Sequence, residues 1–226
     1  SPDFAKSFMV IIQLPAILAV VLYFWGKLWP FGKGKDPAPT IRLWFLIVAA
    51  FLPAAVLGFL LDKVIEKYLF TPPVVAGALV VGGVVLIAIE KIGIRHRFEK
   101  VDDFKFPPAV AVGFFQCLAM IPGTSRSAAT IVGGMAMGAA RPAAAEFSFF
   151  LAIPTMLGAT ALKVFKHGLH FSGHEWALLA AGSAVSFLVA YAVIAAFMRY
   201  IQTRSFIPFG WYRIVLGVMV ALTLLF

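Results

Sequence analysis

The chain has little charge and almost no cysteine for its length. Of its 226 residues, 13% are charged, and Cys117 is the single cysteine. One cysteine excludes an intrachain disulfide and a cysteine-rich metal site. Acidic residues are the scarcer sign, and the net charge is +9. The basic residues lie mostly between apolar runs, where they are typical of topology signals and contacts with anionic lipid, so no nucleic-acid partner is expected.

Apolar residues are abundant instead. They make up 62% of the chain, and the mean hydropathy is +0.97, more than a water-soluble domain of this size needs. Long uninterrupted runs also exclude the alternating pattern of an outer-membrane barrel. The sequence predicts an all-α polytopic membrane protein with six transmembrane helices, at 8–25, 41–61, 74–90, 146–165, 176–198 and 208–226.

The stretch Ile121-Pro122-Gly123-Thr124-Ser125-Arg126-Ser127 lies inside an otherwise uncharged segment. An arginine on a membrane helix costs roughly 3 to more than 10 kcal/mol, so it usually faces a cavity or a partner. Pro122 and Gly123 break a helix just before it. Backbone N–H groups and hydroxyls would then surround one guanidinium, whose planar fork matches phosphate oxygens. A helix restarting at Ser127 would direct its positive end to the same point, so the stretch predicts an oxyanion site, with phosphate favoured.

An ordinary loop between two helices, with Arg126 extending to the surface, is the alternative. The flanking lengths argue against it, because each arm is shorter than the roughly 20 residues that a span needs. A single helix over 108–138 would be about 46 Å long, against a hydrocarbon core of about 30 Å. We therefore expect a re-entrant helix-loop-helix hairpin over 106–140.

Sparse internal matches suggest inverted repeats. A shift of 139 residues places Phe147, Pro154 and Leu157 on Phe8, Pro15 and Leu18, and a shift of 136 places Phe206 and Pro208 on Phe70 and Pro72. Three spans per half give the halves opposite orientations, and broken helices then meet near the midplane. The prediction is a single membrane domain, 1–226. Its first repeat, 1–105, lacks a hairpin, and its second, 106–226, holds the re-entrant hairpin 106–140 plus three helices.

Three segments carry a resemblance to a known family: Phe115-Gln116-Cys117-Leu118-Ala119, Pro122-Gly123-Thr124-Ser125-Arg126-Ser127-Ala128-Ala129-Thr130 and Glu146-Phe147-Ser148-Phe149. Together they resemble the undecaprenyl-pyrophosphate phosphatase family of the bacitracin-resistance type. The resemblance implies an integral membrane enzyme that removes the terminal phosphate of the C55 isoprenyl pyrophosphate. This reaction recycles the lipid carrier for peptidoglycan synthesis and gives bacitracin resistance.

The resemblance also implies roles for particular residues. Arg126 and Ser125 would be catalytic, and the substrate-binding set would be Gly123, Thr124, Ser125, Arg126, Ser127 and Thr130. Gln116 and Glu146 match positions of a supporting kind. The family requires a divalent cation, Mg²⁺ or Ca²⁺. Its other signature, Glu-x-x-x-Glu followed by Ser-Ser-Thr-Gly-His, has no match here, so the metal ligands are expected on an N-terminal segment absent from this chain, without which residues 1–226 should not hydrolyse the lipid.

The cellular location and the orientation in the membrane are expected from the same resemblance and from the distribution of basic residues. Most basic residues between the predicted spans share one side, which the positive-inside rule makes cytoplasmic. We expect a multi-pass protein of the bacterial cytoplasmic membrane with its site open to the outer face. Its partners would be the isoprenyl pyrophosphate and the bilayer, and a homodimer is compatible with the sequence.

Three other functions compete with this one. A secondary transporter or flippase for an anionic lipid fits inverted repeats and a broken hairpin equally well. Lipid phosphatases of the type-2 phosphatidic-acid class follow their Ser-Arg pair with His and Asp, which 128–137 lacks. No Gly-x-x-x-x-Gly-Lys loop occurs, which argues against a nucleotide-driven pump.

Overall fold

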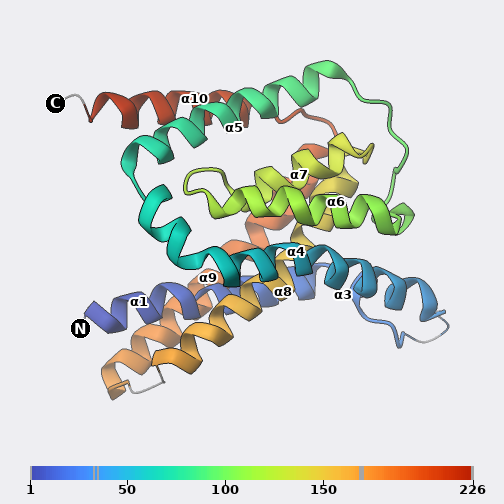
Figure 1. The fold of residues 1–226 in the computed structure, drawn as a ribbon. Helices are drawn as coiled ribbons and strands as arrows, with labels where there is room; N and C mark the ends of the chain where they lie inside the picture. Colours follow the sequence, from blue (N-terminus) through green and yellow to red (C-terminus); the bar gives the residue numbers. More distant parts are fainter. Residues whose placement is uncertain (1, 33, 35, 168–170, 225–226) are drawn as a thin grey trace. The chain divides into compact units, whose positions relative to one another are not determined.

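The fold is helical throughout the part of the chain that the computed structural model describes, which is residues 2–32, 34, 36–167 and 171–224. Its longer helices, labelled in Figure 1, are α1 (Pro2–Ile11), α2 (Gln13–Tyr23), α4 (Ala38–Leu69), α5 (Pro72–Ile92), α6 (Phe106–Cys117), α7 (Arg126–Ala136), α8 (Arg141–His167), α9 (Gly173–Ile201) and α10 (Ile207–Leu222). The short elements are α3 (Trp25–Leu28) and the 3₁₀ turns η1 (Val101–Asp103) and η2 (Leu118–Met120). The predicted all-α class is confirmed.

Four helices are long and apolar enough to cross a membrane: Ala38–Leu61 of α4, all of α5, Arg141–Ala161 of α8 and all of α9. In α4, α5 and α9 only 22%, 17% and 11% of the most apolar window is buried inside the protein. Such exposed apolar surface requires a lipid environment, so this is a multi-pass membrane protein. The predicted spans 8–25 and 208–226 correspond to shorter apolar helices, Ser7–Tyr23 and Ile207–Leu222. The predicted span 41–61 ends where the apolar span Ala38–Leu61 ends, and α4 continues as a helix to Leu69.

The chain forms two compact units. Unit 1 comprises Ser1–Trp44 and Phe149–Arg199, and unit 2 comprises Phe45–Ser148 and Tyr200–Phe226. In unit 1 the first apolar run is interrupted at Ile12, as Pro15 cannot donate a helical hydrogen bond to residue 11. The Ser186 hydroxyl of α9 donates to the Ile12 carbonyl at 2.7 Å, beside this interruption. Because the units interleave along the chain, the predicted repeats 1–105 and 106–226 stay a prediction.

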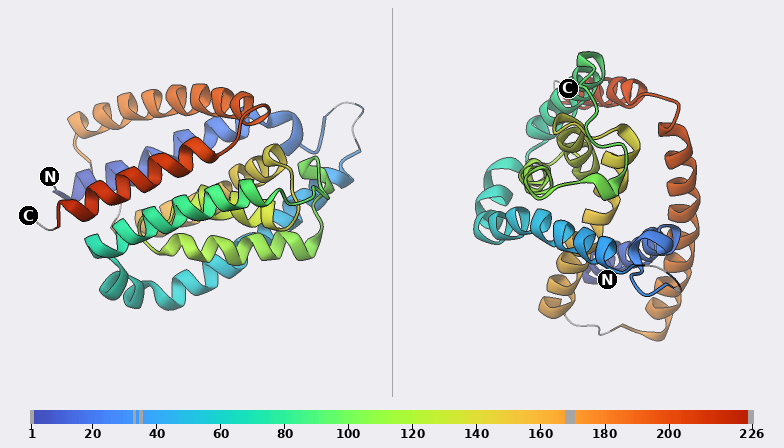
Figure 2. Two further views of the ribbon diagram at one scale, coloured as in Figure 1. Left: turned by 90° about the horizontal axis from the view of Figure 1, so that it is seen from above. Right: turned by 90° about the vertical axis from the view of Figure 1, so that its right-hand side faces the viewer.

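In unit 2, α5 and α10 lie side by side and antiparallel (Figures 1 and 2). Glycines make this approach possible. A Cβ on Gly83 would lie 2.6 Å from the Gly210 carbonyl oxygen, and one on Gly217 would lie 2.9 Å from the Ala76 carbonyl oxygen. Small residues allow membrane helices to approach closely, and this contact depends on backbone-to-backbone packing.

The hairpin consists of α6, η2, the loop 121–125 and α7, and its two arms pack together. A Cβ on Gly133 would meet the Phe115 side chain at 2.7 Å, so the arms are in close contact. The chain before the hairpin is bound to the chain after it. Arg97 and Phe98 donate their backbone N–H groups to the Gly138 carbonyl at 2.7 and 3.2 Å, and Ala140 N–H donates to the Phe98 carbonyl at 2.8 Å. The hairpin therefore begins and ends at the same place in unit 2.

Candidate anion-binding site

The site begins at the tip of the hairpin, where Ser125 has an unusual backbone. Its φ is 68°, and among the described residues it is the one non-glycine residue with a positive φ. Ser125 is also the N-cap of α7, since its Oγ accepts a hydrogen bond from Ala128 N–H at 3.4 Å. The Ser127 hydroxyl lies 3.3 Å from the same oxygen. The helix thus begins at Arg126, one residue earlier than predicted, and the N–H groups of its first turn have no intrahelical acceptor.

Arg126 is the cation of this site. Its Nη1 donates to the Ser148 backbone carbonyl at 3.5 Å, and the side chain is partly buried. Among the residues that the structure describes, no carboxylate pairs with it. A guanidinium has five N–H donors, so most of them are available to a ligand. Free donors, a helix N-terminus and two hydroxyls at one point form an arrangement suited to an oxyanion.

Thr130 and Ser148 form hydrogen bonds with Arg126 and with each other. The Thr130 hydroxyl donates within α7 to the Arg126 carbonyl at 2.9 Å, and it lies 2.6 Å from the Ser148 hydroxyl of α8. Thr130 is 1% exposed. In this conformation its hydroxyl connects two helices, and its role as a substrate contact stays a prediction. Ser148 lies in one of the three segments that carry the family resemblance, but the resemblance implies no role for it.

The remaining predicted residues lie around this centre. Gly123 has a φ of 91°, and a Cβ there would lie 2.6 Å from the Val75 carbonyl oxygen of α5. Thr124 donates its backbone N–H to the Ile121 carbonyl at 3.1 Å and closes the turn. Gln116 is buried in α6, and Glu146 is partly exposed in α8. The supporting roles of Gln116 and Glu146 stay predictions.

Arg213 is a second buried arginine that the sequence reasoning missed. It lies in the apolar helix α10, is 8% exposed, and donates through Nη2 to the Gly123 carbonyl at 3.0 Å and the Ala78 carbonyl at 3.2 Å. A charged residue in the middle of a predicted span was the signal that could have identified it.

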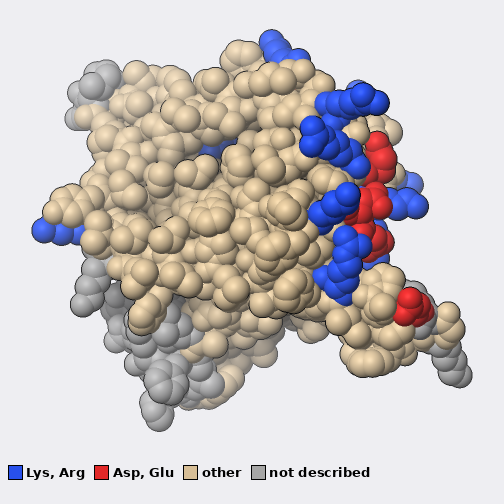
Figure 3. Space-filling view, turned by 45° about the vertical axis from the view of Figure 1, so that its right-hand side comes forward, with Lys and Arg blue, Asp and Glu red and all other residues tan. Residues whose placement is uncertain are grey.

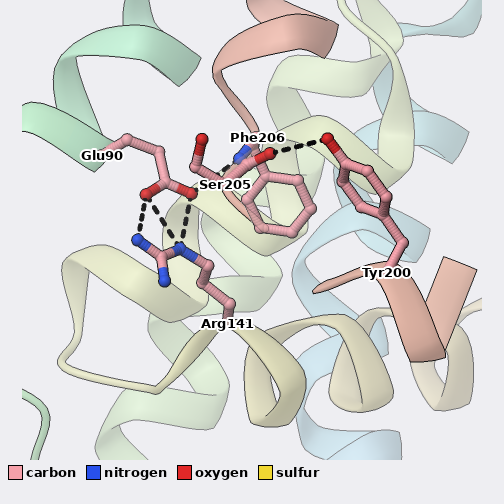
Figure 4. A network of polar contacts seen from close by, with 5 residues as sticks. All are labelled: Glu90, Arg141, Tyr200, Ser205 and Phe206. Atoms are coloured by element: carbon pink, nitrogen blue, oxygen red, sulfur yellow. Dashed lines mark hydrogen bonds and ion pairs between the residues drawn. The ribbon is translucent and has the colours of Figure 1, made fainter. Parts of the chain in front are cut away.

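A buried ion pair was also missed. The Glu90 carboxylate, at the end of α5, accepts from Arg141 Nε at 2.8 Å and from the backbone N–H of Phe206 at 2.9 Å (Figure 4). The Glu90 side chain is 1% exposed and that of Arg141 is 37% exposed. Tyr200 contributes nearby by donating to the Ser205 carbonyl at 3.5 Å. One carboxylate thus joins the end of α5 to the beginnings of α8 and α10.

An apolar groove lies between α5 and the hairpin. Its volume is about 370 Å³, and its lining includes Val81, Val85, Phe115, Leu118, Val132 and, at the loop, Thr124. None of the residues that line this groove is charged, whereas the 91–105 region carries many charges; Figure 3 shows a cluster of basic and acidic groups side by side.

The expected divalent cation has no ligand set in the described part of the chain. No group of three or more His, Cys, Asp or Glu side chains that could hold a metal ion occurs there. His96 lies in a loop, His167 is the last residue of α8, and His174 lies in the first turn of α9.

These features define an integral membrane protein with a partly buried arginine at the tip of a helical hairpin. The model of the family described as bacitracin resistance protein BacA matches residues 1–219, and the chain belongs to this family. It is 52% identical to the undecaprenyl-diphosphatase of Fusobacterium nucleatum, over 99% of this chain and 86% of that protein. It is 47% identical to undecaprenyl-diphosphatase 1 of Clostridioides difficile, over 97% and 81% respectively. The undecaprenyl-diphosphatase of Enterococcus faecalis is 45% identical, over 98% and 83%.

Proposed function

We propose that this protein is an undecaprenyl-diphosphatase, an integral membrane hydrolase that converts undecaprenyl diphosphate to the monophosphate. Relatives of 45–52% identity bear this enzyme name over nearly the whole chain. The observation that supports it in the structure is Arg126, a partly buried guanidinium without a described carboxylate partner at the start of α7. The product would re-enter cell-wall synthesis as lipid carrier, which fits the bacitracin resistance in the family's name.

Arg126 and the first turn of α7 would bind the diphosphate. Phosphoryl transfer depends mainly on positioning and on neutralising the charge of the transferred group. The Arg126 guanidinium, the Ser125 and Ser127 hydroxyls and the N–H groups of the first turn would do this for the terminal phosphate. No step is assigned to the divalent cation, because the described residues form no ligand cluster for it.

The apolar groove gives the lipid a place beside this site. Thr124 belongs both to the loop and to the groove lining, so a chain lying there would be continuous with a diphosphate at α7. Its volume of about 370 Å³ lies at the lower end of the range for ligand pockets, enough for the first part of an isoprenyl chain.

The topology we propose has six spans in inverted repeats and a re-entrant hairpin. The hydrogen bonds between Phe98 and the 138–140 segment support re-entry, because they keep both ends of the hairpin together. With the charged 91–105 loop in the cytoplasm, the hairpin enters from that side, and its tip approaches an outward-facing substrate. The corresponding location is the bacterial cytoplasmic membrane.

Phosphate release from undecaprenyl diphosphate in detergent, by the full-length protein with Mg²⁺ or Ca²⁺ present, tests the function. Arg126→Lys keeps the charge but loses the planar fork, so it should fail nearly as badly as Arg126→Ala. Losing one or two charge-assisted hydrogen bonds, each about 1.5–3 kcal/mol, predicts a fall of roughly 10- to 10⁴-fold. The matched control is Arg204→Lys at an exposed position. Near-normal turnover by Arg126→Lys would contradict the role of the fork.

A transporter or flippase of anionic lipid is the weaker alternative, since these relatives are named as hydrolases. It would move the lipid across sealed vesicles and release no phosphate in detergent.

A further inference from the structure

Arg213 occupies a position that is expensive for an arginine. It lies in the apolar helix α10, is 8% exposed, and among the described residues has no carboxylate partner. Its Nε is buried without a hydrogen-bond partner in the described part of the chain. Charged residues inside membrane helices are costly and usually serve a function. The two hydrogen bonds of its Nη2 indicate which segments of the protein this side chain holds in place.

One of those bonds reaches the hairpin loop and the other reaches α5. Nη2 lies 3.0 Å from the Gly123 carbonyl oxygen and 3.2 Å from that of Ala78. Gly123 and Ser125 both have positive φ angles, 91° and 68°. A non-glycine residue in such a conformation persists only when the surrounding structure holds it. Arg213 supplies one of those constraints from outside the hairpin.

We infer that Arg213 is a positioning residue of the site: it fixes the Gly123 carbonyl against α5 and so holds the loop that presents Ser125 and Arg126, a role that rests on the proposed function. Arg213 does not bind the diphosphate itself. In the described part of the chain its hydrogen-bond acceptors are two backbone carbonyls, and both accept from Nη2. A lysine ammonium can therefore replace part of this interaction, whereas Arg126 needs its planar fork.

Gly82 offers a way to move the guanidinium without mutating it. A Cβ on Gly82 would overlap Arg213 Nη2 and would lie 3.1 Å from Cζ. Gly82→Ala should push the guanidinium away from the Gly123 carbonyl. Gly77 is its matched control, since it lies on the same helix and lines the same groove, but a Cβ there meets nothing within 4 Å. Gly77→Ala thus measures what one methyl group does in the groove alone.

The test compares kcat and KM for undecaprenyl diphosphate in the detergent-solubilised protein. Misplacing a catalytic group by about 1 Å can cost roughly 100-fold, so Arg213→Met should lower kcat by about 10- to 100-fold and change KM by less than about threefold. Arg213→Lys should recover at least part of this loss. Gly82→Ala should lower kcat beyond Gly77→Ala, and in the Arg213→Met background it should have no further effect, because the group that it displaces is gone.

A second readout is independent of turnover. In a Cys117→Ala background, a cysteine at Thr124 should react faster with a soluble thiol reagent in the Arg213→Met and Gly82→Ala variants than in the parent. If the full-length wild type, assayed with Mg²⁺ or Ca²⁺ present, releases no phosphate, the proposed function fails, while the labelling still reports on the loop. A folded Arg213→Met protein with wild-type kcat and labelling would overturn the positioning role. So would additive effects of Gly82→Ala and Arg213→Met. Should Arg213→Met fail to fold, Gly82→Ala decides the matter alone.

Discussion

The Glu90–Arg141 pair should respond very differently to the loss of each partner. Arg141→Met would leave a carboxylate that is 1% exposed with the Phe206 N–H as its remaining donor. Removing one partner of a buried ion pair costs about 3–5 kcal/mol of unfolding free energy. Glu90→Gln keeps an acceptor for Phe206 and leaves a guanidinium that is 37% exposed and can be solvated. Its cost should be about 1.5–3 kcal/mol, the value of a hydrogen bond to a charged group.

The assay is unfolding of the detergent-solubilised protein by SDS, followed by the fluorescence of its 5 tryptophans. Arg204→Met, at an exposed position, is the control for a charge lost from the surface. The double variant Glu90→Gln/Arg141→Met should be less destabilised than the sum of the single variants, because neither charge is left unpaired. If Glu90→Gln destabilises as much as Arg141→Met, or if the two effects add, burial of the carboxylate is not what makes this pair important.

Three further outcomes are expected. Ser125→Gly should raise stability by about 0.5–1 kcal/mol, because glycine relieves the positive φ and loses little as an N-cap, yet it should lower turnover as much as Ser125→Ala; an unchanged turnover in both variants would show that the hydroxyl is not needed. Gly123→Ala should cost at least about 1–2 kcal/mol in the same SDS titration, since its backbone is left-handed and its Cβ would meet the Val75 carbonyl oxygen at 2.6 Å; wild-type stability would exclude the tight contact with α5. Single cysteines at Lys105 and Met137, in a Cys117→Ala background, should be labelled from the same side by an impermeant thiol reagent, and labelling from opposite sides would rule out re-entry.

Local sequence patterns predicted the helical class and the break between α6 and α7 well. Pro122 and Gly123 interrupt the helix, and the break lies where those residues require it, since α6 and η2 end at Met120 and α7 begins at Arg126. The arms of the hairpin were recognisable because each is too short to cross a membrane. The continuation of α4 beyond its apolar span was not predicted. Charged residues such as Lys67 do not end a helix by themselves, and the helix ends only near Pro72.

The contacts between distant segments could not be predicted in this way. Glu90 and Arg141 each appear at the edge of an apolar run, where a charge is ordinary, and nothing local indicates that they pair. Arg213 donates to the Gly123 carbonyl, 90 residues earlier in the chain, and a backbone acceptor leaves no trace in side-chain composition. The sequence therefore predicted the loop of the candidate site, but it did not predict the contacts that α5, α8 and α10 make with this loop and its neighbours.

The Glu90 contacts also set an order of events during synthesis. Arg141 follows Glu90 by 51 residues, and Phe206 follows it by 116 residues. At a synthesis rate of about 5–20 residues per second, Arg141 is added roughly 3–10 seconds after Glu90, and Phe206 about twice as long after it. During that interval the nascent α5 carries an unpaired acid, which must stay in contact with water. The carboxylate can leave water only after α8 has emerged, so the final burial of this end of α5 is a late step of biogenesis.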